Sequence, residues 1–159
     1  MTEWVKTPHP PPLDDERELL LAFLAHLRAS ILRKLEDLGE EEARWRPDGR
    51  LMSVLGVVNH LTNVEQRWID GRMTGAVTSR EETEFHPGPE VTVPEAADRY
   101  RARGAATEAA VRSMPLTTVA QDGTGRNLRW VLLHMIDETA RHAGHVDATR
   151  EMLDGTTGV

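Results

Sequence analysis

The stretch from 127 to 153 constrains the fold of this chain more than any other part of the sequence. It is long enough for about seven helical turns, and it contains no proline and a single glycine, Gly144. At roughly 100° per residue its apolar side chains share one broad face, which is made by Leu128, Val131, Leu132, Met135, Thr139, Val146, Thr149 and Leu153. The stretch therefore predicts a long amphipathic helix.

Two ionisable residues, Glu138 and His142, fall inside that apolar face. A carboxylate and an imidazole are costly to bury unless something pairs with them. Their spacing of four residues puts both side chains on one side of the helix, one turn apart. A helix can offer two ligands to one metal ion in this way. A core histidine hydrogen-bonded to a core glutamate is the alternative, and such pairs are common in helical bundles.

Three further segments repeat apolar residues at helical spacing. The first begins with Asp14 or Asp15 as its cap and runs until Gly39, and a polar connector over 40–47 follows it. The second runs from its cap, Ser53, to about Asp70. The third covers roughly 95–113, after a capping box formed by Thr92 and Glu95. With the helix over 127–153, they predict an all-α, four-helix bundle.

The whole chain, 1–159, is short enough to form a single domain. Its first residues, 1–13, are rich in proline, which predicts an extended N-terminal arm. The segment 73–93 has no convincing period, and it forms a long connection between the second and third helices. We expect this connection to cross one end of the bundle. Connections of this length are often functional.

Composition and charge exclude several classes of protein. A net charge of −7 argues against nucleic-acid binding, which needs a basic surface. The sequence has no apolar run of the roughly 18 residues that a membrane span requires, and the N-terminus has no apolar core typical of a signal peptide. We therefore expect a cytoplasmic protein. The absence of cysteine excludes disulfides, thiolate ligands and a cysteine nucleophile.

Two motifs carry a resemblance to a known family, NHLTNVEQRWI over 59–69 and HMIDETARHAGHVDATRE over 134–151. They resemble the DinB/YfiT-like bundle superfamily, and most closely the subfamily once labelled mini-circle protein. Mycothiol-dependent maleylpyruvate isomerases carry a related domain. The resemblance covers most of the chain and includes the segment LEDLGEEEARWRP over 35–47. It implies a DinB-like bundle that binds a divalent metal.

The resemblance also implies which residues bind the metal. In that superfamily one histidine of the second helix and two residues of the last helix, four apart, hold the ion. Alignment on Gly144 matches the pair to Glu138 and His142, and the motif of the second helix matches the remaining ligand to His60. The helical spacing alone favours a surface or packing role for His60, so its assignment as a ligand comes from the resemblance. Two other histidines at the edge of the last helix's apolar face are accessory candidates, His134 and His145; the latter stands where the family usually has Gln.

Two imidazoles and a carboxylate suit Zn²⁺ best and leave positions open for a metal-bound water or thiol, although Ni²⁺ or Fe²⁺ also fits. The resemblance implies transfer or isomerisation of a low-molecular-weight thiol adduct, with a small electrophile as partner. The only two lysines are Lys6 and Lys34, a usage typical of GC-rich genomes that favours mycothiol as the thiol. A metal-dependent hydrolase and a non-enzymatic bundle that binds metal or a small ligand are the alternatives. We also allow for a homodimer.

Overall fold

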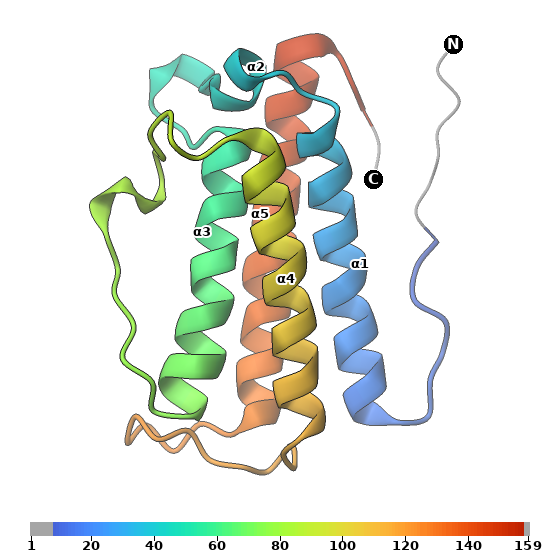
Figure 1. Ribbon diagram of the computed structural model, residues 1–159. Helices are drawn as coiled ribbons and strands as arrows, with labels where there is room; N and C mark the ends of the chain where they lie inside the picture. The colour runs from blue at the N-terminus through green and yellow to red at the C-terminus, as the bar shows by residue number, and fades with distance from the viewer. Residues whose placement is uncertain (1–7, 158–159) are drawn as a thin grey trace.

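The computed structural model describes residues 8–157, and four long helices lie side by side in it (Figure 1). They are α1 (Glu16–Glu36), α3 (Val54–Gln66), α4 (Val93–Arg112) and α5 (Leu128–Asp154). The predicted all-α, four-helix bundle is therefore confirmed. Part of the expected N-terminal arm, residues 1–7, lies outside the described residues. None of the described helices is both long and apolar enough to cross a membrane.

Three of the four long helices begin at capping residues that the sequence predicts, and Asn127 caps the fourth. Asp15, Ser53 and Asn127 each accept a hydrogen bond from the backbone N–H three residues on, at 2.9–3.0 Å. At the start of α4, the Thr92 hydroxyl accepts a hydrogen bond from the Glu95 N–H, and the Glu95 carboxylate accepts one from the Thr92 N–H in return. These side chains satisfy backbone donors that have no partner inside their helices.

The connections near α1 and α3 differ from the expectation. α1 ends at Glu36, and Gly39 is instead the first cap of a short helix, α2 (Glu40–Arg44), within the predicted polar connector. A 3₁₀ turn, η1 (Pro47–Gly49), follows it. α3 continues without a break into a π-helix, η2 (Arg67–Met73). Such widened turns are rare and often occur at functional sites.

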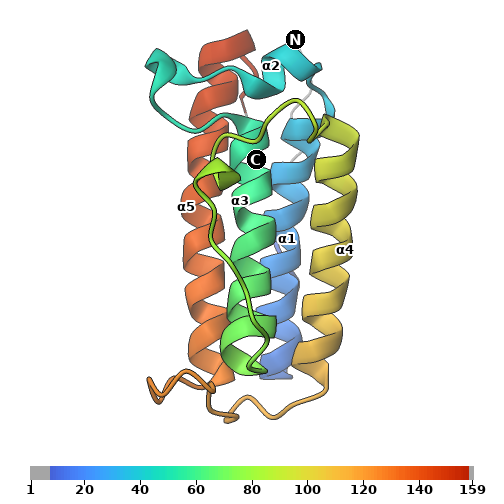
Figure 2. The ribbon, with the colours of Figure 1, turned by 60° about the vertical axis from the view of Figure 1, so that its left-hand side comes forward.

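The long connection over 74–92 does not cross one end of the bundle, as the sequence suggested. α3 and α4 run in the same direction, so the chain has to return along the length of the bundle, as Figures 1 and 2 show. On the way it forms a 3₁₀ turn, η3 (Glu82–Glu84), beside α3. Gly56 of α3 allows this close approach, because a Cβ atom there would lie 2.3 Å from the Phe85 carbonyl oxygen.

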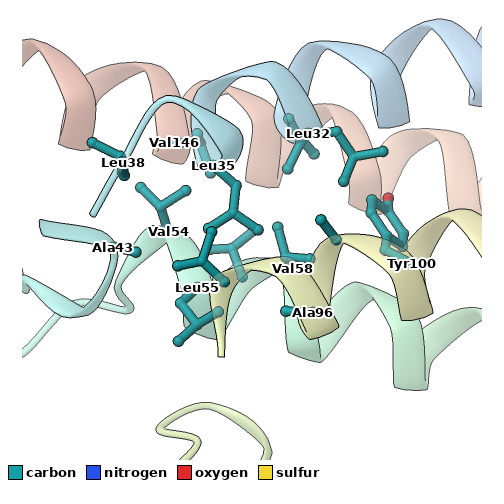
Figure 3. Close-up of a cluster of buried hydrophobic side chains, with 14 of the residues drawn as sticks. Leu32, Leu35, Leu38, Ala43, Val54, Leu55, Val58, Ala96, Tyr100 and Val146 are labelled. Atoms are coloured by element: carbon teal, nitrogen blue, oxygen red, sulfur yellow. The ribbon is translucent and has the colours of Figure 1, made fainter. Parts of the chain in front are cut away.

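The buried apolar side chains form two clusters, one toward each end of the bundle. Figure 3 shows part of the first cluster, with Leu35, Val58, Tyr100 and Val146. Along each long helix, buried polar side chains occupy the turns between the two clusters; they include Arg28, Glu65, Thr107 and Thr139. A polar layer therefore crosses the middle of the bundle, and the predicted metal-binding residues lie in or next to it.

Candidate metal centre

The structure brings the three predicted ligands together across α3 and α5. His60, Glu138 and His142 each offer a ligand atom, and these atoms lie within 4.8 Å of one another. His60 is buried, whereas Glu138 and His142 are half-buried. A Zn²⁺ ion binds such donors at about 2 Å, so the three side chains would share one ion by rotating toward a common point. The donor set therefore fits a divalent metal.

The surroundings of His142 keep its imidazole neutral. Burial, with the nearby His60 adding to it, lowers the pKa of His142 to about 4. The His60 and His142 rings meet edge to face, with their centroids 4.9 Å apart. At neutral pH the ring of His142 therefore has a free lone pair, which a metal ligand requires.

His60 is oriented by a carboxylate from the long connection. Its Nδ1 atom donates a hydrogen bond to Oε1 of Glu84, at 2.5 Å. Arg67 of the π-helix donates two hydrogen bonds to the same carboxylate, at 2.5 and 2.8 Å. Burial alone raises the pKa of Glu84, but the bonds from Arg67 and His60 lower it overall. A charged Glu84 fixes the Nδ1–H tautomer, so the Nε2 lone pair points toward α5.

The Nε2 atom of His60 faces a second carboxylate, with Oε1 of Glu138 at 3.3 Å. A neutral imidazole has only one ring proton, and Glu84 already accepts it. The Nε2 lone pair of His60 and the Glu138 oxygen therefore face each other and repel. The contact becomes favourable when a positive charge lies between them, either a second proton or a cation.

The two accessory histidines lie on opposite sides of this cluster. His134 Nε2 is 3.2 Å from Oε2 of Glu138, and its ring stacks on Trp130 at a centroid distance of 5.2 Å. His145 instead donates from Nε2 to the carbonyl of Met52, at 2.9 Å, and so ties α5 to the segment before α3. His134 thus contacts a predicted ligand, while His145 is held by the backbone.

A cavity of about 660 Å³ opens beside the three residues. It extends along α3 and α5 and over the π-helix, which supplies Arg67, Trp68 and Arg72 to its wall. The Trp68 ring lies next to that of His134, with centroids 4.6 Å apart. A volume of this size suits a small organic ligand. The three donors therefore meet where both a metal and a small molecule have access.

Sequence reasoning missed Glu84 and Arg67. Their contacts with the site join residues 17 to 24 positions apart and pass through a segment without helical period. Two features did point there, namely the acidic run over 81–84 and the unusual length of the connection. The helical spacing of His60 does not show that its side chain is buried, whereas in the structure it is only 5% exposed.

Comparisons with known proteins identify related sequences and folds. A family model described as mycothiol S-transferase matches residues 19–155. A solved structure, the conserved protein of a locus from Enterococcus faecalis, is similar with a TM-score of 0.66 and 16% sequence identity, over 91% of this chain and 100% of that chain. At this identity the likeness shows the fold alone. No curated protein matches the sequence.

Proposed function

The chain belongs to the mycothiol S-transferase family, a DinB/YfiT-like family, and on this premise we propose that it transfers the sulfur of mycothiol to a small electrophile at a divalent metal centre. The observation that supports this best is the three-residue donor set, His60, Glu138 and His142, beside an open cavity. When bound, a metal with open positions lowers the pKa of a thiol or water. Because the chain has no cysteine, the sulfur has to come from a co-substrate.

In this proposal the chain's own residues bind the metal, orient its ligands and admit the substrates. Glu84 holds the ring of His60 so that Nε2 points at the site, and Arg67 holds Glu84. The neutral imidazole of His142 and the carboxylate of Glu138 supply the other two donors. Zn²⁺ is the metal that we expect, since it accepts this mixture of nitrogen and oxygen ligands.

The function is tested with purified, metal-loaded protein, mycothiol and a panel of small electrophiles. We expect mycothiol and the electrophile to disappear together, a thioether to form in equal amount, and the reaction to stop after chelation. Loss of the electrophile without use of the thiol would instead indicate hydrolysis by metal-activated water. If no electrophile reacts faster with the protein than without it, the proposed activity is wrong. The chain would then be a bundle that binds metal without this activity.

Replacing either accessory histidine by alanine should leave the metal in place. His145 is held by the Met52 carbonyl, and His134 faces the Glu138 oxygen that does not contact His60, so neither is needed as a ligand. Metal content after dialysis, measured for His134→Ala, His145→Ala and Glu138→Ala, checks this. A loss in either histidine variant that equals the loss in Glu138→Ala would mean that the ligand pair is displaced around the helix.

Replacing Glu84 by glutamine should weaken metal binding without abolishing it. Partners that orient a ligating histidine typically contribute a factor of about 10–100 to metal affinity, and Glu84 is such a partner of His60. Glu82→Gln is the matched control, because Glu82 belongs to the same 3₁₀ turn but is exposed. Competition with a chelator gives the Zn²⁺ dissociation constants, and equal constants for the two variants would contradict the role of Glu84.

A further inference from the structure

More arginines than carboxylates line the cavity beside the three donors, although the chain as a whole carries −7. Four arginines line it, Arg67, Arg72, Arg80 and Arg141, against two carboxylates, Asp137 and Glu138. The guanidinium groups come from the π-helix, the long connection and α5. Because walls of one sign concentrate ligands of the other, the cavity favours an anion.

The four arginines differ in how far they are already neutralised. The Arg67 guanidinium group donates one hydrogen bond to each oxygen of the Glu84 carboxylate, so its charge is already paired. Arg72 donates to Asp122 at 2.9 Å, and Arg141 makes only an exposed contact of 3.4 Å with Asp137. An exposed pair such as Arg141 with Asp137 contributes little to stability. A bound anion can therefore readily replace the carboxylate in it.

Arg80 is the arginine that is best placed to bind a ligand. Among residues 8–157 it forms no ion pair, and its guanidinium carbon lies 5.4 Å from the centre of the Phe85 ring. That ring in turn packs on His60, with centroids 4.8 Å apart. Arg80 is thereby positioned one aromatic ring away from a predicted metal ligand, and its planar group is able to bind a carboxylate through two hydrogen bonds.

Part of the cavity wall is aromatic. Trp68 lines it, with the Arg72 guanidinium carbon 4.5 Å from the ring centre and the Trp130 ring at a centroid distance of 5.6 Å. A flat, unsaturated molecule suits such a wall, since aromatic faces stack on planar groups. The arginines, the aromatic wall and the three donors therefore surround one space.

From this arrangement we propose that the electrophile is a planar organic anion whose carboxylate is bound by Arg80, with Arg72 assisting, while its reactive carbon faces the His60, Glu138 and His142 cluster. This inference rests on the proposed thiol transfer and adds the class of the second substrate. In the reaction the sulfur of the thiol forms a bond to the electrophilic carbon, the leaving group departs with its electron pair, and the thiol proton passes to solvent.

The proposal is tested with two electrophiles of the same shape, 4-(chloromethyl)benzoate and 4-(chloromethyl)benzamide. Both release chloride when mycothiol attacks the benzylic carbon, but only the first is an anion. For each electrophile, kcat/KM is divided by the rate constant of the same reaction without protein. This ratio should be at least about tenfold higher for the benzoate than for the benzamide. In Arg80→Gln this preference should fall to about threefold or less, through a higher KM for the benzoate, with the benzamide unaffected.

Arg99→Gln is the matched control, since Arg99 is an exposed arginine of α4 that does not line this cavity. It should keep the full preference for the benzoate. Equal kcat/KM values for the two electrophiles in the wild type, or an unchanged preference in Arg80→Gln, would overturn the inference while leaving thiol transfer intact.

A binding measurement separates this inference from the proposed function. Chelated protein is titrated with the unreactive 4-methylbenzoate and 4-methylbenzamide by calorimetry, so that neither turnover nor a metal contributes. We expect binding of the benzoate only, weakened about tenfold in Arg80→Gln and reduced by added salt. Equal binding of the two compounds, or no binding of either, would refute an anion site. Loss of thiol transfer alone would leave this result unchanged.

Discussion

Replacement of His142 by alanine is expected to remove the metal from the protein. His142 supplies one of three donors, and a site with so few protein ligands cannot readily lose one. The variant should retain less than about a tenth of the wild-type metal after dialysis, whereas the bundle stays folded because the side chain is only half-buried. Metal content by elemental analysis and circular dichroism check the two parts.

His26→Ala is the control for His142→Ala, because His26 belongs to α1 and lies outside the donor cluster. It should keep its metal. Full metal occupancy in His142→Ala would mean that another set of side chains binds the ion, and the proposed centre would then be wrong.

The second large effect concerns a buried ion pair in the polar layer. Arg28 of α1 donates two hydrogen bonds to the Glu65 carboxylate of α3, at 2.6 and 2.9 Å. Both side chains are buried, at 7% and 2% exposure. Gly104 of α4 packs on the guanidinium group, where a Cβ atom would lie 3.2 Å from Arg28 Cδ. Three helices therefore meet at this pair.

Replacing Glu65 by alanine should destabilise the bundle by about 3–5 kcal/mol, because it leaves the Arg28 charge buried with too few partners. For a chain of this size the melting midpoint should fall on the order of 10 °C, as measured by circular dichroism. Glu16→Ala is the control, since Glu16 pairs with Arg129 at the surface, and exposed pairs contribute little. Similar midpoints for Glu65→Ala and Glu16→Ala would show that the buried pair does not stabilise the fold.

The double replacement Arg28→Met with Glu65→Leu separates charge from packing. Apolar residues of similar volume often replace a buried ion pair without loss of stability. We therefore expect the double variant to melt well above Glu65→Ala. A midpoint as low as that of the single variant would assign the effect to packing and not to an unpaired charge.

The helices themselves were predictable because each one has a local signal. The caps at Asp15, Ser53, Thr92 and Asn127 satisfy backbone donors within the same turn, and apolar spacing marks the face that is buried. The direction of the long connection was not predictable from these signals. It depends on α3 and α4 running in the same direction, which is decided by packing between distant segments.

Some residues of the candidate site could be predicted from the sequence, and others could not. Glu138 and His142 lie one turn apart on one helix, so their spacing alone brings them together. His60 is on another helix, and only the resemblance to a family singled it out. Glu84 reaches the site from an irregular segment for which no periodicity exists. Its partner Arg67 lies in a π-helix, where the usual helical spacing no longer shows which side chains share a face.

The sequence also carries a signal for the buried pair of Arg28 and Glu65. Arg28 falls between Leu24 and Ile31 on the apolar stripe of α1, at spacings of four and three residues. Glu65 stands in the same relation to Leu61 on α3. A charged residue at such a position is buried unless the helix is distorted, and it then needs a partner of opposite charge. Two such positions on separate helices predict an ion pair between them.

The metal content of His60→Gln, set beside that of the wild type, is the most direct test of a metal centre shared by α3 and α5. His60 is the one donor that comes from α3, and glutamine roughly keeps its volume. We expect about one divalent metal per wild-type chain and almost none in His60→Gln, with the variant still folded by circular dichroism. Full metal occupancy in folded His60→Gln would contradict a metal held between the two helices.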